Sequence, residues 1–183
     1  MLISLTRENL YKEPLLAFIR EIAANARDAN REVGFHKVPV KITLPNGFDN
    51  SIRIRDCGPG ISPERMDIYL GYGLSTKRDS NLQTGGFGLG AKSPFSYSEE
   101  YTISSTTLEN DKKVKRTYFA VKEGTGSTNL IDEIVVRDPN EKTGVEIAVP
   151  IKKNDVYRVK DIIKNLFSYW DVKPEISPSK ELL

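Results

Sequence analysis

The amino-acid sequence predicts an α+β domain of two layers, in which helices cover one face of a β-sheet. A helical periodicity opens the chain, several short β-type segments fill its middle, and a second helical periodicity lies near its end. The 183 residues suit one compact domain. We therefore expect the helices to pack together against a single sheet.

The first helix is expected over residues 7–33, where Pro14 either kinks the helix or begins its regular part. Apolar side chains return at the spacing of one helical face, and this core stripe comprises Leu15, Ile19, Ile22, Ala26, Ala29 and Val33. Gly34 is expected to end the helix, because glycine readily adopts the left-handed conformation that follows many helices.

Short elements follow this helix. Residues 37–44 and 51–56 are expected to form two strands around a turn at Asn46-Gly47. A short helix is expected over residues 62–70, with serine as its cap and proline at its first position. Residues 71–90 predict a long loop, and loops of this length in compact domains are usually functional or disordered.

The second half of the chain predicts more strands and one more helix. The expected strands are 100–108, 115–123, 129–137 and 144–151, with a charged turn over 110–113. An amphipathic helix is expected over about 154–170. The segment that follows contains proline and serine and predicts a linker or a frayed end over 171–183.

Composition and charge exclude several function classes. The 27 Lys and Arg residues nearly balance 25 Asp and Glu residues, which is unlike a protein that binds nucleic acid or an anionic membrane. No run of eighteen apolar residues is present, and the N-terminus carries charges too early for a signal peptide, so we expect a cytoplasmic protein. Cys57 is the one cysteine of the sequence, which excludes internal disulfides. His36 is the one histidine, which makes a histidine-centred triad an unattractive hypothesis.

The first helix carries a polar row beside its apolar stripe. Glu21, Asn25 and Asp28 fall within about 60° of one another on the helical wheel. A carboxylate with an amide oxygen suits Mg²⁺, which prefers oxygen ligands and keeps several waters. A second carboxylate could orient an attacking water. Taken alone, such a row is more often a solvated helix face.

Two glycine-containing segments complete the set of candidate sites. The segment DCGPGI (56–61) directly follows a strand and allows a tight turn with close approach of a flat ligand, although such a segment, taken alone, is more often an ordinary Asp-Gly turn. The segment TGGFGLGAKS (84–93) precedes a short helix and offers backbone N–H groups to a phosphate. It matches neither the Walker pattern nor the dinucleotide spacing, so a flexible glycine loop remains the alternative.

In this order the three segments EIAANARDA (21–29), DCGPGI (56–61) and GLSTKRDSNLQTGGFGLGAKS (73–93) resemble the GHKL ATPases. That family comprises the gyrase B subunit, the heat-shock-ninety chaperones, the histidine kinases and MutL. The resemblance covers about residues 10–151. Two further segments, GGFGLGAKSPFSYSEEYTI and KTGVEIAVP, are similar to the N-terminal ATPase-like region of phage rapid-lysis protector A proteins.

The resemblance implies a Bergerat fold over residues 1–170, with a mixed sheet, helices on one face and a mobile ATP lid at about 71–85. It implies ATP and Mg²⁺ as cofactors, Glu21 as the general base and Asn25 as the metal ligand. Asp56 would take the adenine amino group. The further nucleotide-binding residues that the resemblance implies are Asp28, Ala29, Gly58, Gly60, Ile61, Lys77, Gly86, Phe87, Gly88, Leu89, Gly90, Ala91 and Thr143.

The chain departs from the family pattern at two points. Val145 stands where the family often has a threonine near the adenine, and Thr143, two residues earlier, is the candidate replacement. Gyrase-type relatives also receive a phosphate-binding lysine from a following domain, which the sequence does not contain. We therefore expect hydrolysis that is slow or that depends on a partner protein to supply this charge.

The expected function is Mg-dependent ATP binding with weak ATPase activity, in which lid closure is coupled to a protein partner. If the protein comes from a phage, it would act in the host cytoplasm. The alternatives are a non-hydrolysing interaction or inhibitor module of the same fold and a serine protein kinase of the same superfamily. A homodimer is left open.

Overall fold

The computed structural model describes residues 13–70, 92–122 and 128–178. These residues contain one seven-stranded sheet of order β5-β4-β3-β6-β2-β1-β7, in which β1 and β7 are parallel and the other pairs are antiparallel. The strands are β1 (Lys41–Leu44), β2 (Ser51–Arg55), β3 (Glu100–Glu109), β4 (Lys112–Val121), β5 (Thr128–Val135), β6 (Gly144–Pro150) and β7 (Glu175–Pro178).

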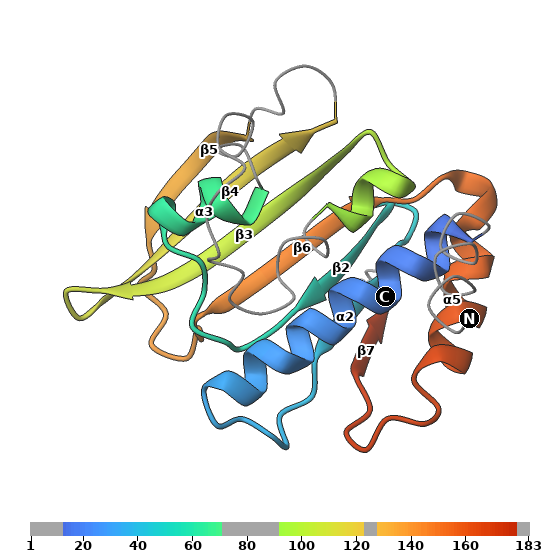
Figure 1. Ribbon diagram of the computed structural model, residues 1–183, viewed down its shortest axis with the longest axis horizontal. Coiled ribbons are helices and arrows are strands. Elements are labelled where there is room, and N and C mark those ends of the chain that lie inside the picture. The colour runs from blue at the N-terminus through green and yellow to red at the C-terminus, as the bar shows by residue number, and fades with distance from the viewer. Residues whose placement is uncertain (1–12, 71–91, 123–127, 179–183) are drawn as a thin grey trace, which may run out of the picture.

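The helices lie on one face of this sheet, as Figure 1 shows. The α-helices are α2 (Pro14–Glu32), α3 (Pro63–Leu70) and α5 (Val156–Leu166), and the 3₁₀ helices are η1 (Ser93–Ser96) and η2 (Lys153–Asp155). The predicted α+β architecture of two layers with a mixed sheet is thereby confirmed. None of these helices combines the length and the apolar character that crossing a bilayer requires.

Helix α2 is the element that carries much of the predicted site. Pro14 begins it at a position where a helix needs no N–H donor. It ends at Glu32, and Gly34 follows with a φ of +83°, as the sequence predicts. Most of the predicted apolar stripe is buried, but Val33 is exposed because it lies beyond the last helical turn.

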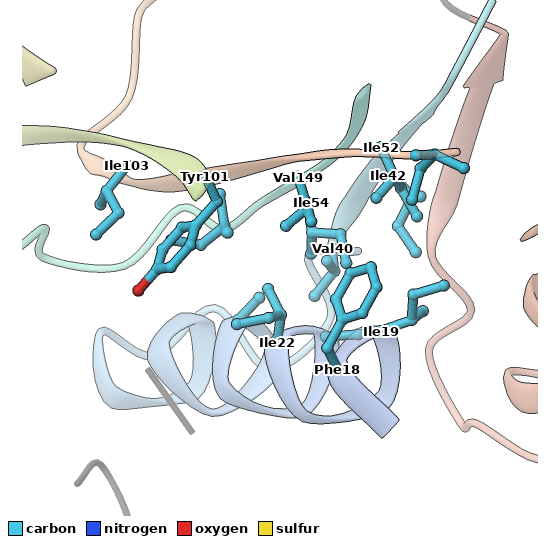
Figure 2. Packing of buried hydrophobic residues seen from close by; sticks show 14 of the residues in the cluster. Phe18, Ile19, Ile22, Val40, Ile42, Ile52, Ile54, Tyr101, Ile103 and Val149 are labelled. Carbon is cyan, nitrogen blue, oxygen red and sulfur yellow. The ribbon is translucent and has the colours of Figure 1, made fainter. Parts of the chain in front are cut away.

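The core lies between α2 and the sheet. Figure 2 shows Phe18, Ile19 and Ile22 of α2 pointing toward the sheet, where they meet mostly β-branched and aromatic side chains. The labelled members of this core are Phe18, Ile19, Ile22, Val40, Ile42, Ile52, Ile54, Tyr101, Ile103 and Val149. Because β2 alternates, Ile52 and Ile54 face this core while Arg53 and Arg55 face the opposite side of the sheet. The contact fixes α2 directly above β2 and β6.

Two predicted strand boundaries are wrong. The strand expected over 37–44 begins only at Lys41, because Pro39 has no N–H to donate and the carbonyl of Val38 accepts a side-chain hydrogen bond. The turn expected over 110–113 occupies only Asn110 and Asp111, whose φ angles are +48° and +61°. Such a two-residue left-handed turn matches strand twist, so β4 starts at Lys112.

The end of the chain also differs from the prediction. Helix α5 stops at Leu166 rather than near 170, and Arg27 of α2 lies over the ring of Trp170, 4.5 Å from its centroid. The linker or frayed end expected from residue 171 is wrong for Glu175–Pro178, which forms β7 beside β1. The outer edge of β1 would otherwise leave its backbone groups unpaired, and β7 satisfies them.

Candidate functional site

Asp56 lies where the end of β2 meets the start of β6. It is 5 % exposed, and its Oδ1 accepts hydrogen bonds from the backbone N–H of Gly58 at 2.8 Å and of Val145 at 2.9 Å. Its own N–H donates to the Val145 carbonyl at 3.0 Å. The carboxylate is therefore held in one orientation by the loop that follows it and by the neighbouring strand.

Burial raises the pKa of Asp56 to about 6, against an ordinary value of 3.8. The hydrogen bonds from Gly58 and Val145 and the positive charge of Arg55 lower this pKa, whereas the negative charge of Glu32 raises it. The ionised carboxylate is thus under-solvated in the unliganded protein. A ligand that brings another hydrogen-bond donor would stabilise it.

Glycines allow the backbone around Asp56 to approach so closely. A Cβ at Gly144, which has a φ of +136°, would lie 2.4 Å from the Asp56 carbonyl and 2.8 Å from its Oδ1. A Cβ at Gly58 would lie 2.8 Å from that of Ala29 on α2. The structure therefore brings Asp56, Gly58 and Ala29 together, as the sequence predicts, and adds Gly144 to the group.

The remaining residues of the 56–61 segment close the loop over β3. Gly60 has a φ of +79° and lies against the backbone carbonyl of Thr106. Ile61 is half-buried and packs against the core. The segment is thus a compact loop between α2 and β3, rather than a solvated turn.

On α2, Glu21 and Asn25 are half-buried at a spacing of four residues, and Ala29 continues the same face. The Nδ2 atom of Asn25 is fully buried and has no hydrogen-bond partner in the part of the chain that the structure describes. Either end of this amide could face a ligand, because oxygen and nitrogen are assigned from hydrogen bonds alone. An orphaned amide in this place fits a ligand-binding role.

Asp28 stands apart from this group. Its side chain is 59 % exposed and forms ion pairs with Arg27 at 3.7 Å and Arg31 at 3.9 Å on its own helix. The structure therefore does not join Asp28 to the contacts around Asp56. Its expected role in nucleotide binding stays a prediction.

Sequence reasoning missed Asn30, which is 1 % exposed. Its Nδ2 donates to the Val38 carbonyl at 3.1 Å, and its Oδ1 accepts from the Cys57 N–H at 2.6 Å. The available signal was its position: Asn30 stands four residues after Ala26, on the buried face of the helix. A polar residue there needs a partner, which predicts a structural hydrogen bond.

Ser105 of β3 was missed as well and is 1 % exposed. Its hydroxyl donates to the Ile61 carbonyl at 2.9 Å and accepts from the Ile61 N–H at 2.8 Å. The signal was a run of four hydroxyl residues, Ser104–Thr107, inside a strand of a small domain. All four are buried, and the backbone of Gly60 and Ile61 packs against Ser105 and Thr106.

Tyr69 on α3 is a third residue that sequence reasoning missed. It is half-buried, and burial raises its pKa, to which the negative charges of Asp56 and Glu21 contribute. The phenol therefore lies within electrostatic reach of both carboxylates.

The chain matches the model of the family of histidine kinase-, DNA gyrase B- and HSP90-like ATPases over residues 11–151. The chain belongs to this family. The GHKL assignment made from the three motifs is confirmed, and with it the Bergerat architecture of the sheet and helices. Membership supports binding of ATP.

Individual relatives are chaperones. Over 179 residues the chain is 27 % identical to heat shock protein 90-5, chloroplastic, of Arabidopsis thaliana, with 81 % of the chain and 22 % of the relative covered. It is 26 % identical to chaperone protein HtpG of Chlorobium chlorochromatii, with 93 % of the chain and 30 % of the relative covered. It is 29 % identical to HtpG of Rickettsia massiliae, with 81 % of the chain and 27 % of the relative covered. The chain spans less than a third of these GHKL relatives.

Of the other predicted site residues, Thr143 belongs to the described part of the chain. Thr143 is half-buried and directly precedes β6, on the side of the chain that Val145 shares. The remaining predicted residues and the expected lid over 71–85 lie outside the described residues; they are Lys77, Gly86, Phe87, Gly88, Leu89, Gly90 and Ala91. Their roles stay predictions that GHKL membership favours.

Proposed function

We propose that this GHKL chain binds ATP together with Mg²⁺ and hydrolyses it slowly. The observation that carries the proposal is Asp56, a buried carboxylate with a raised pKa that is oriented by Gly58 and Val145 and lacks full solvation. An exocyclic amino group of a purine is a neutral donor of the right chemistry for it. Family membership supports the same ligand.

The loop around Asp56 would bind the base. Gly58 lets the loop pack closely against Ala29 of α2, and Gly60 lets it pack against the backbone of Thr106. Ile61 would supply an apolar contact to the base. Adenine would therefore lie between α2 and β3, with its amino group at Asp56.

Asn25 would hold Mg²⁺ through its amide oxygen. The fit rests on the buried Nδ2 of Asn25, which has no partner among the described residues and exchanges places with the oxygen when the amide is flipped. Mg²⁺ prefers oxygen ligands from the protein, from waters and from phosphates. Within the described residues no three His, Cys, Asp or Glu side chains cluster in a way that could hold a metal. When bound, Mg²⁺ neutralises charge on the phosphates.

Glu21 would act as the general base. It stands one helical turn before Asn25 and is half-buried, which places a carboxylate beside the proposed phosphate end. There it would accept a proton from water as the water oxygen bonds to the γ-phosphorus and the bond to ADP breaks. The products are ADP and inorganic phosphate.

The lid at 71–85, its contact through Lys77 and its coupling to a protein partner belong to this proposal, but they concern residues outside those described. Slow turnover, or turnover that depends on a partner protein, belongs to the proposal as well. The likeness to phage proteins, the cytoplasmic location and a homodimer stay predictions as well.

Titration calorimetry with ADP and ATP, each with and without Mg²⁺, tests binding. We expect micromolar binding that Mg²⁺ strengthens for ATP, and no binding would overturn the proposal.

Release of phosphate from ATP by the purified protein then separates an ATPase from a non-hydrolysing interaction module. Transfer of labelled phosphate to a serine of an added protein would instead support the kinase alternative.

A further inference from the structure

Two buried polar side chains hold the 56–61 loop, and neither contributes to the chemistry proposed above. Asn30 comes from α2 and Ser105 from β3, so the loop is attached to two elements that are far apart in sequence. Both side chains are 1 % exposed. Burying a polar side chain costs stability unless the side chain is hydrogen-bonded. Both side chains form their hydrogen bonds with the backbone of the loop, so we ask what holding the loop achieves.

Asn30 uses both ends of its amide. It donates to Val38 in the segment before β1 and accepts from Cys57, the residue directly after Asp56. The side chain therefore fixes the spacing between α2 and the beginning of the loop. A shift of the loop by about 1 Å would break the hydrogen bond from Cys57 to Asn30, in a site that water does not reach.

Ser105 acts at the other end of the loop, where its one hydroxyl both donates to and accepts from Ile61. In the sheet, Ser105 stands opposite Val145, whose N–H is bound by Asp56. The first and last residues of the loop are thus attached to one rung of the sheet. Asp56 is held from β6 and Ile61 from β3.

We propose that Asn30 and Ser105 are positioning residues, which hold Cys57 and Ile61 so that Asp56 and Gly58 are in place before a nucleotide arrives. This inference rests on the proposed function, because it assigns the loop to the base of an adenine nucleotide. A loop that is ordered in advance loses little entropy when the ligand binds. Without the hydrogen bonds to Asn30 and Ser105, the loop would become ordered only when the nucleotide binds. This loss of entropy would weaken the affinity.

A matched pair of variants isolates the hydroxyl of Ser105. Ser105→Thr and Ser105→Val add side chains of almost the same shape, so any steric cost is shared, but only Ser105→Thr keeps the hydroxyl. We expect ADP to bind about tenfold more weakly to Ser105→Val than to Ser105→Thr in titration calorimetry. If Ser105→Thr retains the affinity of the wild type for ADP, the hydrogen bonds of the residue 105 side chain support binding and its volume does not.

Asn30→Leu gives the corresponding test on α2, since leucine has similar size and no hydrogen-bonding group. Val159→Ala is its control, because Val159 is a fully buried residue of α5 that takes no part in the site. Both variants should unfold at a lower temperature by circular dichroism. Only Asn30→Leu should weaken ADP binding, again by about tenfold.

Hydrogen exchange of the unliganded proteins gives a second readout. The amides of Cys57 and Ile61 should exchange faster in Asn30→Leu and Ser105→Val than in Ser105→Thr and Val159→Ala. If the wild type binds ADP but Asn30→Leu and Ser105→Val bind within about twofold of it, the positioning role is wrong and the proposed function stands. If the wild type does not bind ADP, the proposed function fails and this inference fails with it.

Discussion

The two ends of the candidate site are built in different ways. At the base end, the polar groups of the loop are paired within the protein: Asp56 with Gly58 and Val145, Cys57 with Asn30, and Ile61 with Ser105. At the α2 end, the amide nitrogen of Asn25 is buried and has no partner among the described residues.

This difference indicates which part of the site is complete without a ligand. The base end is a preformed recognition surface, because its backbone geometry is fixed by contacts that do not involve a nucleotide. The α2 end has a buried polar group without a partner among the described residues, which an added ligand, ion or water would satisfy. We therefore expect substitutions at the α2 end to affect turnover, and substitutions at the base end to affect affinity and stability.

Glu21→Ala gives the largest expected effect and tests the α2 end. Loss of a positioned base should reduce phosphate release by about 10²–10⁴-fold. Binding of ADP should stay within about threefold of the wild type, because the proposal assigns Glu21 to the phosphate end and not to the base. Arg20→Ala is a matched control on an exposed position of the same helix, and it should keep normal turnover. Equal turnover of the Glu21→Ala variant and the wild type would remove Glu21 from catalysis.

Asp56→Asn tests the base end through affinity. Its amide oxygen still accepts from Gly58 and Val145, but the side chain loses the charge that would bind the adenine amino group. We expect ADP to bind about ten- to hundredfold more weakly at pH 7.5, measured by calorimetry. Wild-type affinity in this variant would contradict the assignment of the loop to the base.

The same variant has an opposite effect on stability. The folded protein holds the Asp56 proton more tightly than the unfolded chain does, because burial raises the pKa from 3.8 to about 6. The contribution of Asp56 to the free energy of unfolding is therefore fully present below about pH 4 and is lost as the pH rises through about 6. Asp56→Asn should unfold at a higher temperature than the wild type, and by a margin that grows between pH 5 and pH 7.

Three glycine variants test how tightly the base end is packed. Gly144→Ala should lower the free energy of unfolding by about 2–4 kcal/mol, because its Cβ would clash with Asp56 and its φ is +136°. Gly34→Ala has a φ of +83° but open space around it, so about 1 kcal/mol is expected. Gly47→Ala has neither problem and should stay within about 0.5 kcal/mol. Urea unfolding that fails to separate Gly144→Ala from Gly47→Ala would contradict the close packing around Asp56.

The sequence predicts the local features of this site and misses those that depend on distant contacts. Pro14, Gly34 and the alternation in β2 are readable because proline, glycine and side-chain period act within a few residues. The hydrogen bond from Cys57 to Asn30 spans 27 residues, and that from Ile61 to Ser105 spans 44. Only the folded arrangement of α2, the loop and β3 reveals them.

Strand β7 was missed for the same reason. The segment Glu175–Pro178 is short and bounded by proline, so its own pattern predicts no strand. It forms one because the outer edge of β1, more than 130 residues earlier, needs a hydrogen-bonding partner. Helical spacing alone predicted a row of Glu21, Asn25 and Asp28. The structure keeps Glu21 and Asn25 half-buried, whereas Asp28 is 59 % exposed and pairs with two arginines of its own helix.

The smallest expected effect concerns Thr143 and Val145, beside Asp56. If Thr143 replaces the threonine that the GHKL pattern often has at position 145, Thr143→Val removes a hydroxyl that acts on the base through water. ADP should then bind about threefold more weakly, because a water-mediated hydrogen bond contributes little net free energy. Val145→Thr keeps the β-branched shape and the backbone N–H that Asp56 accepts, and should bind ADP about threefold more tightly. A neutral Thr143→Val beside a tighter Val145→Thr would show that the base end works without the hydroxyl, on its backbone contacts and Asp56 alone.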